Sequence, residues 1–460
     1  MRRTAVILVV GLTESLLAHA PRLRALAGSH ATRLLRPPLP AVTCTAQASM
    51  LTGQPVAQHG IVANGWYDRS LAEVQFWKQS NRLVQREKVW HEARRRDPSF
   101  TCANLFWWYN MYADVDLAVT PRPIYKADGR KIPDIHTHPA DLRDRLNAEL
   151  GPFPLFKFWG PLAGIESTRW ITDAATRLEQ WHSPTLSLVY LPHLDYPLQR
   201  LGPDHPDVPN EVIAVDREVG RLLDLYESRG VQPIVVSEYG IEPVDTPVHI
   251  NRALLHAGLL RVRVEDGLEL LDAGASEREG AFAVADHQVA HVYASDPGRL
   301  EDVARVCGAV PGVERVLSRD DMRARGLAHE RCGDLLLVAR QGAWFTYYYW
   351  LDDARAPDFA RTVDIHRKPG YDPVELFRRS DVSTLGVMRR LAMRKVGLRT
   401  LLDVIPLDAS LVQGSHGRTD VARGHLPLLI APGRLLDAIS PSAEFPCESV
   451  RDLILGSLFA

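Results

Sequence analysis

The sequence predicts an α/β fold: a doubly wound, mostly parallel sheet flanked by helices, with a small inserted α/β cap. Continuous apolar runs at residues 5–10, 185–191 and 233–236 have the pattern of strands that are buried on both faces. Stretches with helical spacing of apolar residues, at 167–181 and 210–229, precede the second and third of these runs. Because helices and apolar strands alternate along the chain, a parallel sheet covered by helices is the predicted architecture.

The remaining elements of the core follow in order. A short helix is predicted at 23–27, a helix at 87–96 and a strand at 100–106. The stretch 120–139 is rich in Pro, Asp and His and has no periodicity. We therefore expect a long surface loop there, close to a functional site.

The chain of 460 residues exceeds one ordinary hydrophobic core. We expect residues 1–245 and 331–460 to form the core and residues 246–330 to form the inserted cap. The cap is predicted from a change of pattern, with helices at 251–257 and 299–308 and strands near 259–264, 291–294 and 313–317. A strand at 333–339 is predicted to return the chain to the main sheet.

The first apolar run follows Arg2 and Arg3, so the start of the chain also resembles a short signal peptide. The run is short for an export signal, and Gly11, Thr13 and Glu14 interrupt it, so we interpret it as the first strand. No later segment is long and apolar enough to span a bilayer. We therefore expect a cytoplasmic protein without a membrane span.

Composition argues against some classes of protein. The net charge of -2 and the pI near 6.8 argue against a strongly basic surface, so we expect no nucleic-acid polymer as a partner. Five cysteines, at positions 44, 102, 307, 332 and 447, show neither a paired disulfide framework nor metal-ligand spacing. This usage suits a reducing compartment.

The segment around Thr43 has the pattern of a nucleophile site. A proline-ended approach reaches Thr43, and residues 45–52 read as a short helix with Thr45 as its cap and Gly53 after its end. The positive end of a helix dipole favours an anion at this position. If a metal or a base removed its proton, the Thr43 hydroxyl could attack phosphorus, and the Asn64 amide could hold the resulting negative oxygen. The alternative is that Thr43 is only a capping or turn residue.

Polar side chains also follow the predicted strands. Thr13, Asp195 and Glu238 each come at or just after the end of an apolar run. Because the carboxyl ends of parallel strands meet at one edge of a sheet, these residues are expected to share a single site with Thr43.

Two later loops contain further candidates for substrate or metal contacts. Asp286 and His287 in ADHQVAH, and His366 and Lys368 in DIHRKPG, are residue types that suit metal or phosphate binding. Trp66 could stack on an aromatic or nucleotide-like part of a substrate. Taken singly, each is more often a hydrogen-bonded or packed structural residue.

The Thr43 segment resembles the nucleotide pyrophosphatase/phosphodiesterase branch of the alkaline phosphatase superfamily. The resemblance rests on the order and spacing of Pro40, Thr43, Leu51-Thr52-Gly53, His59-Gly60-Ile61 and Asn64. It implies an alkaline phosphatase-like fold, a threonine nucleophile and two zinc ions. Sulfatases share the Leu-Thr-Gly ending but need Cys or Ser at the position of Thr43, followed by Pro and Arg, so a sulfatase is not expected.

The resemblance also implies a set of metal ligands, and this chain matches it only in part. Asp195 and His416 match the family pattern. The other positions differ from the family pattern. Thr13 and Glu238 stand where the family has Asp, and Gln199 and Tyr239 stand where it has His. The cofactor implied is a divalent metal, zinc, as one or two ions.

Two hypotheses about function follow, and they belong to different classes. In the first, the chain is a metal-dependent phosphodiesterase or phosphatase that hydrolyses a small phosphate ester, such as a nucleotide-like one, with Thr43 as nucleophile. In the second, the catalytic centre is degenerate and the protein binds a ligand or acts as a scaffold. A phosphomutase or transferase on the same fold would use the same groups, and the sequence does not separate it from a hydrolase.

Overall fold

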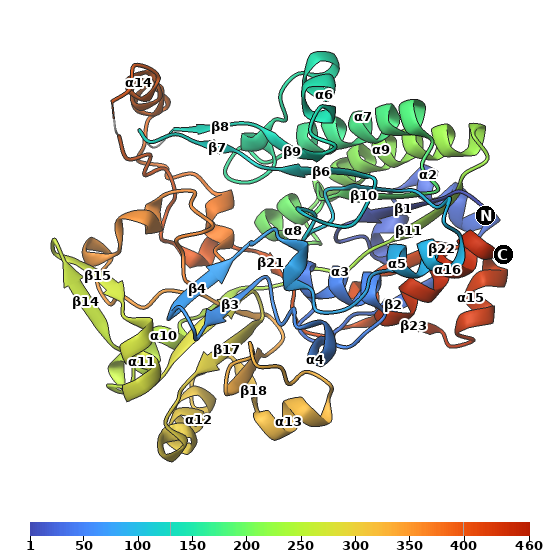
Figure 1. Cartoon of the computed structure of the whole chain (residues 1–460). Coiled ribbons are helices and arrows are strands. Elements are labelled where there is room, and N and C mark those ends of the chain that lie inside the picture. The colour runs from blue at the N-terminus through green and yellow to red at the C-terminus, as the bar shows by residue number, and fades with distance from the viewer. Residues whose placement is uncertain (129, 399) are drawn as a thin grey trace.

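The main sheet of the protein confirms the predicted fold class. The computed structural model describes residues 1–128, 130–398 and 400–460. Its largest sheet has nine strands in the order β23-β2-β22-β11-β1-β10-β5-β6-β9 (Figure 1). The bounds are β1 Thr4–Val9, β2 Ala31–Arg36, β5 Cys102–Leu105, β6 Leu117–Pro121, β9 Ile135–His138, β10 Leu186–Leu191, β11 Gln232–Val236, β22 Leu428–Ala431 and β23 Glu444–Pro446.

Strand β1 lies at the centre of this sheet and is buried along its whole length. It pairs in parallel with β10 on one side and with β11 on the other, so that Val6 lies opposite both Leu188 and Ile234. Strand β22 runs antiparallel to its neighbours β11 and β2, and β9 runs antiparallel to β6. The predicted strands at 5–10, 185–191 and 233–236 are therefore the three adjacent central strands.

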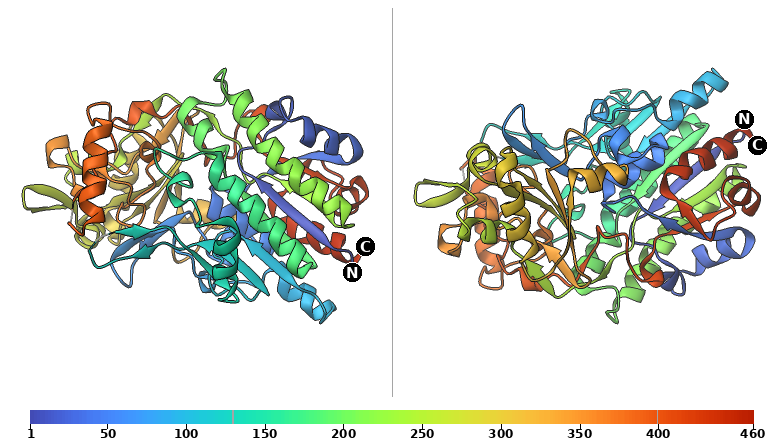
Figure 2. Two further views of the ribbon diagram at one scale, coloured as in Figure 1. Left: turned by 90° about the horizontal axis from the view of Figure 1, so that it is seen from above. Right: turned by 90° about the horizontal axis from the view of Figure 1, so that it is seen from below.

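Helices cover both faces of the main sheet. On one face, α9 contacts both α2 and α7, and on the other, α16 contacts α3, α5 and β1 (Figures 1 and 2). The two termini lie side by side at one end of the molecule, where the Arg2 N–H donates to the Leu458 carbonyl over 2.8 Å (Figure 2). The bounds are α1 Glu14–Leu17, α2 Pro21–Ser29, α3 Thr43–Thr52, α4 Val56–His59, α5 Val89–Arg96, α6 Leu142–Leu150, α7 Ile165–His182, α8 Asp195–Leu201, α9 Val208–Ser228, α15 Gly433–Ile439 and α16 Val450–Phe459.

A second sheet of four antiparallel strands, in the order β16-β17-β19-β18, has its own hydrophobic cluster of buried residues. Strand β19 pairs with β17 and β18, so the expectation that the strand at 333–339 rejoins the main sheet is wrong. The division of the chain at residues 245 and 330 stays a proposal. The bounds in this part are α10 Ile250–His256, β14 Val262–Glu265, β15 Leu268–Leu271, α11 Ala273–Glu279, β16 Phe282–Asp286, β17 Val289–Tyr293, α12 Leu300–Gly308, β18 Val313–Ser318, α13 Arg319–Ala324 and β19 Leu335–Ala339.

The expected long loop at 120–139 is also corrected. Its last part forms the edge strand β9, and its middle forms a small hairpin of β7 (Ile124–Tyr125) and β8 (Lys131–Ile132). The segment IHTH of β9 alternates in burial, as expected for a sheet edge with one face toward solvent.

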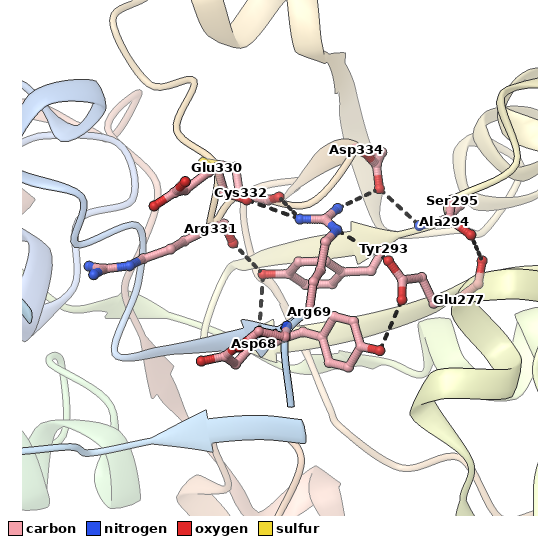
Figure 3. Close-up of polar contacts among 12 residues, drawn as sticks. Asp68, Arg69, Glu277, Tyr293, Ala294, Ser295, Glu330, Arg331, Cys332 and Asp334 are labelled. Atoms are coloured by element: carbon pink, nitrogen blue, oxygen red, sulfur yellow. Dashed lines mark hydrogen bonds and ion pairs between the residues drawn. The ribbon is translucent and has the colours of Figure 1, made fainter. Parts of the chain in front are cut away.

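Arg69 ties the hairpin of β3 (Gly65–Asp68) and β4 (Glu73–Phe76) to the second sheet (Figure 3). Its guanidinium donates to the Glu277 and Asp334 carboxylates over 3.2 and 2.8 Å and to the carbonyl oxygen of Cys332 over 3.1 Å. It also lies over the ring of Tyr293, with 5.0 Å between the guanidinium carbon and the ring centroid. This contact set anchors the chain that leaves the Thr43 region onto the second sheet.

Within the described ranges, no helix combines the length and the apolar character that crossing a bilayer requires.

Candidate functional site

Candidate residues from distant parts of the chain converge at the carboxyl ends of the central strands. Asp195 is the first residue of α8, directly after β10, and Glu238 and Tyr239 follow β11. Thr43 is the first residue of α3, and His416 follows the short strand β21 (Gly414–Ser415). Strands β1, β10 and β11 are parallel neighbours, so their ends lie along one edge, as the doubly wound fold requires.

Helix α3 begins at Thr43, two residues earlier than predicted. Its cap is Val42. Thr45 is buried inside the helix, and the Thr45 hydroxyl has no hydrogen-bond partner. The prediction of Thr45 as the capping residue is therefore wrong. The Thr43 hydroxyl consequently lies in the first turn of a ten-residue helix, where the helix dipole favours negative charge.

The hydroxyl of Tyr239 lies between the candidate nucleophile and the best-matched metal ligand. It is 3.1 Å from the Thr43 hydroxyl and donates to Oδ1 of Asp195 over 3.1 Å. Burial raises the pKa of Tyr239 well above its ordinary value, so the phenol keeps its proton. A protonated phenol donates a hydrogen bond to Asp195 and is a poor metal ligand.

The second oxygen of Asp195 is also engaged. The Gln199 amide donates to Oδ2 over 2.8 Å, and the Gln199 carbonyl oxygen accepts from the hydroxyl of Tyr371 over 3.0 Å. Both ends of the Gln199 side chain are thus bonded within the protein, and so are both oxygens of Asp195.

Glu238 lies on the other side of Thr43. Its Oε2 accepts from the Gln47 amide over 2.8 Å, and the neighbouring Thr43 hydroxyl opposes the rise in the pKa of this carboxyl. Its Oε1 is buried without a hydrogen-bond partner. Gln47 stands one helical turn after Thr43, and this i,i+4 spacing puts both side chains on one face of α3.

Asn64 connects helix α3 to the second sheet. Its side-chain oxygen accepts from the Cys44 N–H over 2.9 Å, and its amide nitrogen donates to Oδ1 of Asp286 over 3.1 Å. The backbone N–H of Asn64 donates to Oδ2 of the same carboxyl over 2.8 Å. One amide hydrogen of Asn64 remains available for a ligand oxygen, because a carboxamide NH₂ carries two donors.

Four aromatic rings pack against one another across the site. His416 stacks on Tyr239 with 3.6 Å between ring centroids and 7° between planes. It also contacts His287, with 3.7 Å between ring centroids and a tilt of 37° between the planes. His287 in turn stacks on Tyr371 at 3.7 Å. Nδ1 of His416 lies 2.8 Å from the Ala41 carbonyl oxygen, so this nitrogen carries the proton. Nε2 of His416 lies 3.9 Å from Oδ1 of Asp195 and has no hydrogen-bond partner.

Burial makes the ionisable groups of this cluster prefer their neutral forms. It raises the pKa of Asp195 to about 7, of Glu238 to about 8 and of Asp286 to about 6, although hydrogen bonds to each carboxyl oppose the shift. It lowers the pKa values of His287 and His416 well below the ordinary range. Near neutral pH Glu238 is therefore mostly protonated and Asp195 about half protonated, so the cluster has less negative charge than three ordinary carboxylates would give.

Other candidate residues lie outside this network. The Thr13 hydroxyl bonds Ser15 over 2.9 Å, and the exposed His366 bonds the Phe76 carbonyl over 3.1 Å. Trp66 is covered by the guanidinium of Arg331, at 4.8 Å. Lys368 is buried between Asp372 and Glu375, with 2.7 Å from its ammonium to each carboxylate, so its charge is already neutralised. The structure therefore does not bring Trp66, His366 or Lys368 to Thr43.

Sequence reasoning missed two members of the network. Gln47 could have been found from its i,i+4 spacing to Thr43 inside a buried helix. Tyr371 follows the DIHRKPG motif by one residue, but its contacts with Gln199 and His287 join segments that are far apart in the chain, and no local pattern indicates them.

The donor set does not fit a two-zinc centre. Two zinc ions of this type need about seven ligands from Asp, His and the nucleophile. Here both oxygens of Asp195 and both ends of Gln199 are bonded within the protein, Tyr239 is a protonated phenol, and Thr13 faces Ser15. In the part of the chain that the structure describes, no group of three or more His, Cys, Asp or Glu side chains is placed to hold a metal ion.

The fold is similar to that of solved ectonucleotide pyrophosphatase/phosphodiesterase and phosphonoacetate hydrolase structures. The chain resembles an inactive variant of murine ectonucleotide pyrophosphatase/phosphodiesterase 5 in complex with AMP, with 13% identity, a TM-score of 0.58 and coverage of 100% of this chain and 95% of that one. The human protein of the same name has 13% identity and a TM-score of 0.59, with coverage of 99% of this chain and 95% of that one. Phosphonoacetate hydrolase from Sinorhizobium meliloti, in complex with phosphonoacetate, has 14% identity and a TM-score of 0.61. The match covers 99% of this chain and 96% of that one. At these identities the likeness shows the fold alone.

No curated protein sequence matches the chain. The family profile of type I phosphodiesterase/nucleotide pyrophosphatase, by contrast, matches residues 4–372, which includes the nucleophile segment and most of both sheets. The chain therefore belongs to the type I phosphodiesterase/nucleotide pyrophosphatase family.

Proposed function

We propose that this protein binds a small phosphate ester at the cluster around Thr43, and that a metal-free hydrogen-bond network stands where relatives hold two metal ions. One observation carries the proposal: the Tyr239 hydroxyl bonds both Thr43 and Asp195, the groups that the resemblance assigns to nucleophile and metal ligand. A phenol in this position satisfies Asp195 without a cation. This arrangement supports the ligand-binding hypothesis over a zinc-dependent hydrolase.

The phosphoryl group would be held by neutral donors. These are the first turn of α3, the free amide hydrogen of Asn64 and the hydroxyls of Thr43 and Tyr239. Carboxyl groups with raised pKa values, at Asp195 and Glu238, repel an anion less than ordinary carboxylates. Asp195 keeps 13% of its side chain exposed, so the ligand would enter from its side. A nucleoside monophosphate is the probe of choice, because AMP occupies a relative of the same fold.

Metal-free hydrolysis is the second candidate, and the electrostatic influence of Thr43 on the neighbouring Glu238 carboxyl favours it. A carboxyl with a pKa of about 8 is a stronger base than an ordinary glutamate once it is ionised. Ionised Glu238 would take the proton of Thr43 as the hydroxyl oxygen attacks phosphorus, and would give that proton to the ester oxygen as the bond between this oxygen and phosphorus breaks, so that the alcohol leaves. Water would then attack the phosphothreonine with Glu238 accepting its proton, and the bond between phosphorus and the Thr43 oxygen would break to restore the threonine and release phosphate.

A comparison of two threonine variants tests both candidates. Thr43→Ala removes a hydroxyl inside the network, and Thr45→Ala removes an unpartnered hydroxyl from the same helix. Binding of AMP, measured by calorimetry, should weaken about tenfold or more in the first variant, as expected for a hydrogen bond to a charged group, and stay unchanged in the second. Equal binding by wild type and Thr43→Ala would overturn the proposal.

Metal content and turnover separate the two candidates. After incubation with zinc and desalting, the wild type should retain less than one ion per chain; two ions per chain would show that the metal centre exists. Hydrolysis of a nitrophenyl phosphodiester should be equally slow in the wild type and Thr43→Ala if the protein only binds its ligand. A loss of about 100-fold or more on Thr43→Ala, unaffected by a chelator, would establish the second candidate instead.

The location of the protein is also a proposal. The five cysteines are free, buried thiols, which supports a reducing compartment such as the cytoplasm.

A further inference from the structure

Helix α14 (Thr384–Lys395) and the residues that follow it display an apolar surface to solvent. Six of the large hydrophobic side chains that the structure leaves exposed fall within 17 consecutive residues. Between 48% and 77% of the surface of each is accessible: Leu385, Met388, Leu391, Val396, Leu398 and Leu401. Leu385, Met388 and Leu391 recur every three residues, so they share one side of the helix.

A surface helix usually turns its apolar side toward the core, whereas α14 turns this side toward solvent. Val387, on another side of α14, packs against the hydrophobic cluster of the second sheet and attaches the helix to the body. Figure 1 shows α14 at the upper left corner, away from both sheets. The apolar side of α14 is therefore exposed to solvent and does not belong to the hydrophobic core.

The same stretch is strongly basic in sequence. Residues 383–401 contain five arginines and lysines, at positions 389, 390, 394, 395 and 399, and no Asp or Glu, although the whole chain carries a net charge of -2. Arg389 is exposed beside Met388. Arg390 forms an ion pair with Asp403, which lies after the stretch. A helix with an apolar side bordered by cations and without acidic residues is complementary to an anionic surface that also accepts hydrocarbon.

We propose that α14 binds the surface of an anionic phospholipid membrane. The exposed side chains of Leu385, Met388 and Leu391 lie on one side of the helix, an arrangement that suits the boundary between headgroups and acyl chains. The basic residues of this stretch of sequence supply charge that is complementary to the negative headgroups. An acidic protein partner is the alternative occupant, and failure of the wild type to bind anionic vesicles would favour it.

Sedimentation of the full chain with vesicles tests this proposal. The wild type should bind vesicles of phosphatidylcholine that contain about a third phosphatidylglycerol, should bind pure phosphatidylcholine vesicles far less, and should be released by salt. The triple variant Leu385→Ser, Met388→Ser, Leu391→Ser should bind the anionic vesicles at least about tenfold more weakly, because it removes the apolar contacts.

A matched control changes three exposed leucines elsewhere, Leu71→Ser, Leu162→Ser and Leu351→Ser, and should leave vesicle binding unchanged. Unchanged far-UV circular dichroism and unfolding midpoint show that each variant is folded. Failure of the wild type to bind anionic vesicles overturns the proposal, as does equal binding to both vesicle types. A wild-type dimer in light scattering that the α14 variant converts to a monomer also overturns it, because a second copy would then cover this side.

Discussion

His59 belongs to the His-Gly-Ile landmark of the family resemblance, and its role in the structure is to fix a turn. Its imidazole is fully buried. Nδ1 accepts from the Ile61 N–H over 3.1 Å, so Nε2 carries the proton and donates to the Ser49 hydroxyl over 3.0 Å. Burial, with smaller contributions from His329 and Arg331, lowers the pKa of His59 to about 3, so the ring is neutral in the folded protein.

This buried neutral ring predicts a loss of stability in mild acid. In the unfolded chain a histidine takes up a proton below about pH 6.5, whereas folded His59 does not, so unfolding binds a proton in this range and becomes easier as the pH falls. The contribution of His59 is about 2 kcal/mol at pH 5. Urea unfolding of His59→Gln should show a smaller difference in free energy between pH 7 and pH 5 than the wild type.

The same substitution at exposed His19 is the control and should leave the pH difference of the wild type unchanged. If His59→Gln and the wild type lose stability equally between pH 7 and pH 5, the imidazole is charged in the folded state and the assignment of its hydrogen bonds is wrong.

At the scale of elements, the loop after residue 363 is held by a buried ion cluster. Lys368 lies between Asp372 and Glu375, and the second oxygen of Glu375 accepts from the Trp159 indole over 2.6 Å. Tyr371, which stacks on His287 in the candidate site, lies inside this loop. The Lys368 side chain that sequence reasoning assigned to a phosphate therefore positions the site without contacting Thr43.

Removing this buried cation should be strongly destabilising. Lys368→Met leaves two carboxylates buried without a counter-charge, for which a loss of about 3–5 kcal/mol is expected. Its neighbour Arg367 pairs with Asp358 at the surface, with about half of each side chain exposed, so Arg367→Met should change the free energy of unfolding by less than about 1 kcal/mol. Urea unfolding measures both. Equal effects of the two changes would show that the buried cluster contributes no more than a surface pair.

Elements differ in how well their sequences indicate their positions. Strands β1, β10 and β11 are continuous apolar runs because both faces are covered, and they were predictable for that reason. Strand β19 has the same apolar character but lies in the second sheet, and burial on both faces does not specify which neighbours a strand pairs with. The edge strand β9 has too few apolar residues to be distinguished from a loop.

At the scale of the whole molecule, the site is assembled from both sheets. Thr43, Asp195 and His416 were predictable because each stands in a motif with family spacing, and the structure brings them together. Tyr371 was not predictable, because its contact with Gln199 joins segments that are far apart in the chain. Site residues that stand in a local motif can be recognised in the sequence. Contacts between distant segments depend on how the chain packs, so they cannot.

Introducing the metal-ligand types that the family resemblance implies tests whether these positions alone decide metal binding. A variant with Thr13→Asp, Gln199→His, Glu238→Asp and Tyr239→His has the donor types that a two-zinc centre needs. It should retain about two zinc ions per chain and hydrolyse a nitrophenyl phosphodiester about 100-fold or more faster than the wild type, because metal ions stabilise the transition-state charge. Adding Thr43→Ala should abolish the gain. A folded variant that retains no zinc would show that the sheets no longer approach each other as a metal centre requires.

The bonding of Gln199 to both Asp195 and Tyr371 makes these side chains depend on one another. Replacing the glutamine alone would leave a phenol and a carboxylate oxygen without their partners in the interior, and replacing Tyr239 alone would do the same to Thr43 and Asp195. The energetic effects of substitutions within this group are therefore expected to be non-additive, so that the cost of a double substitution differs from the sum of its single costs.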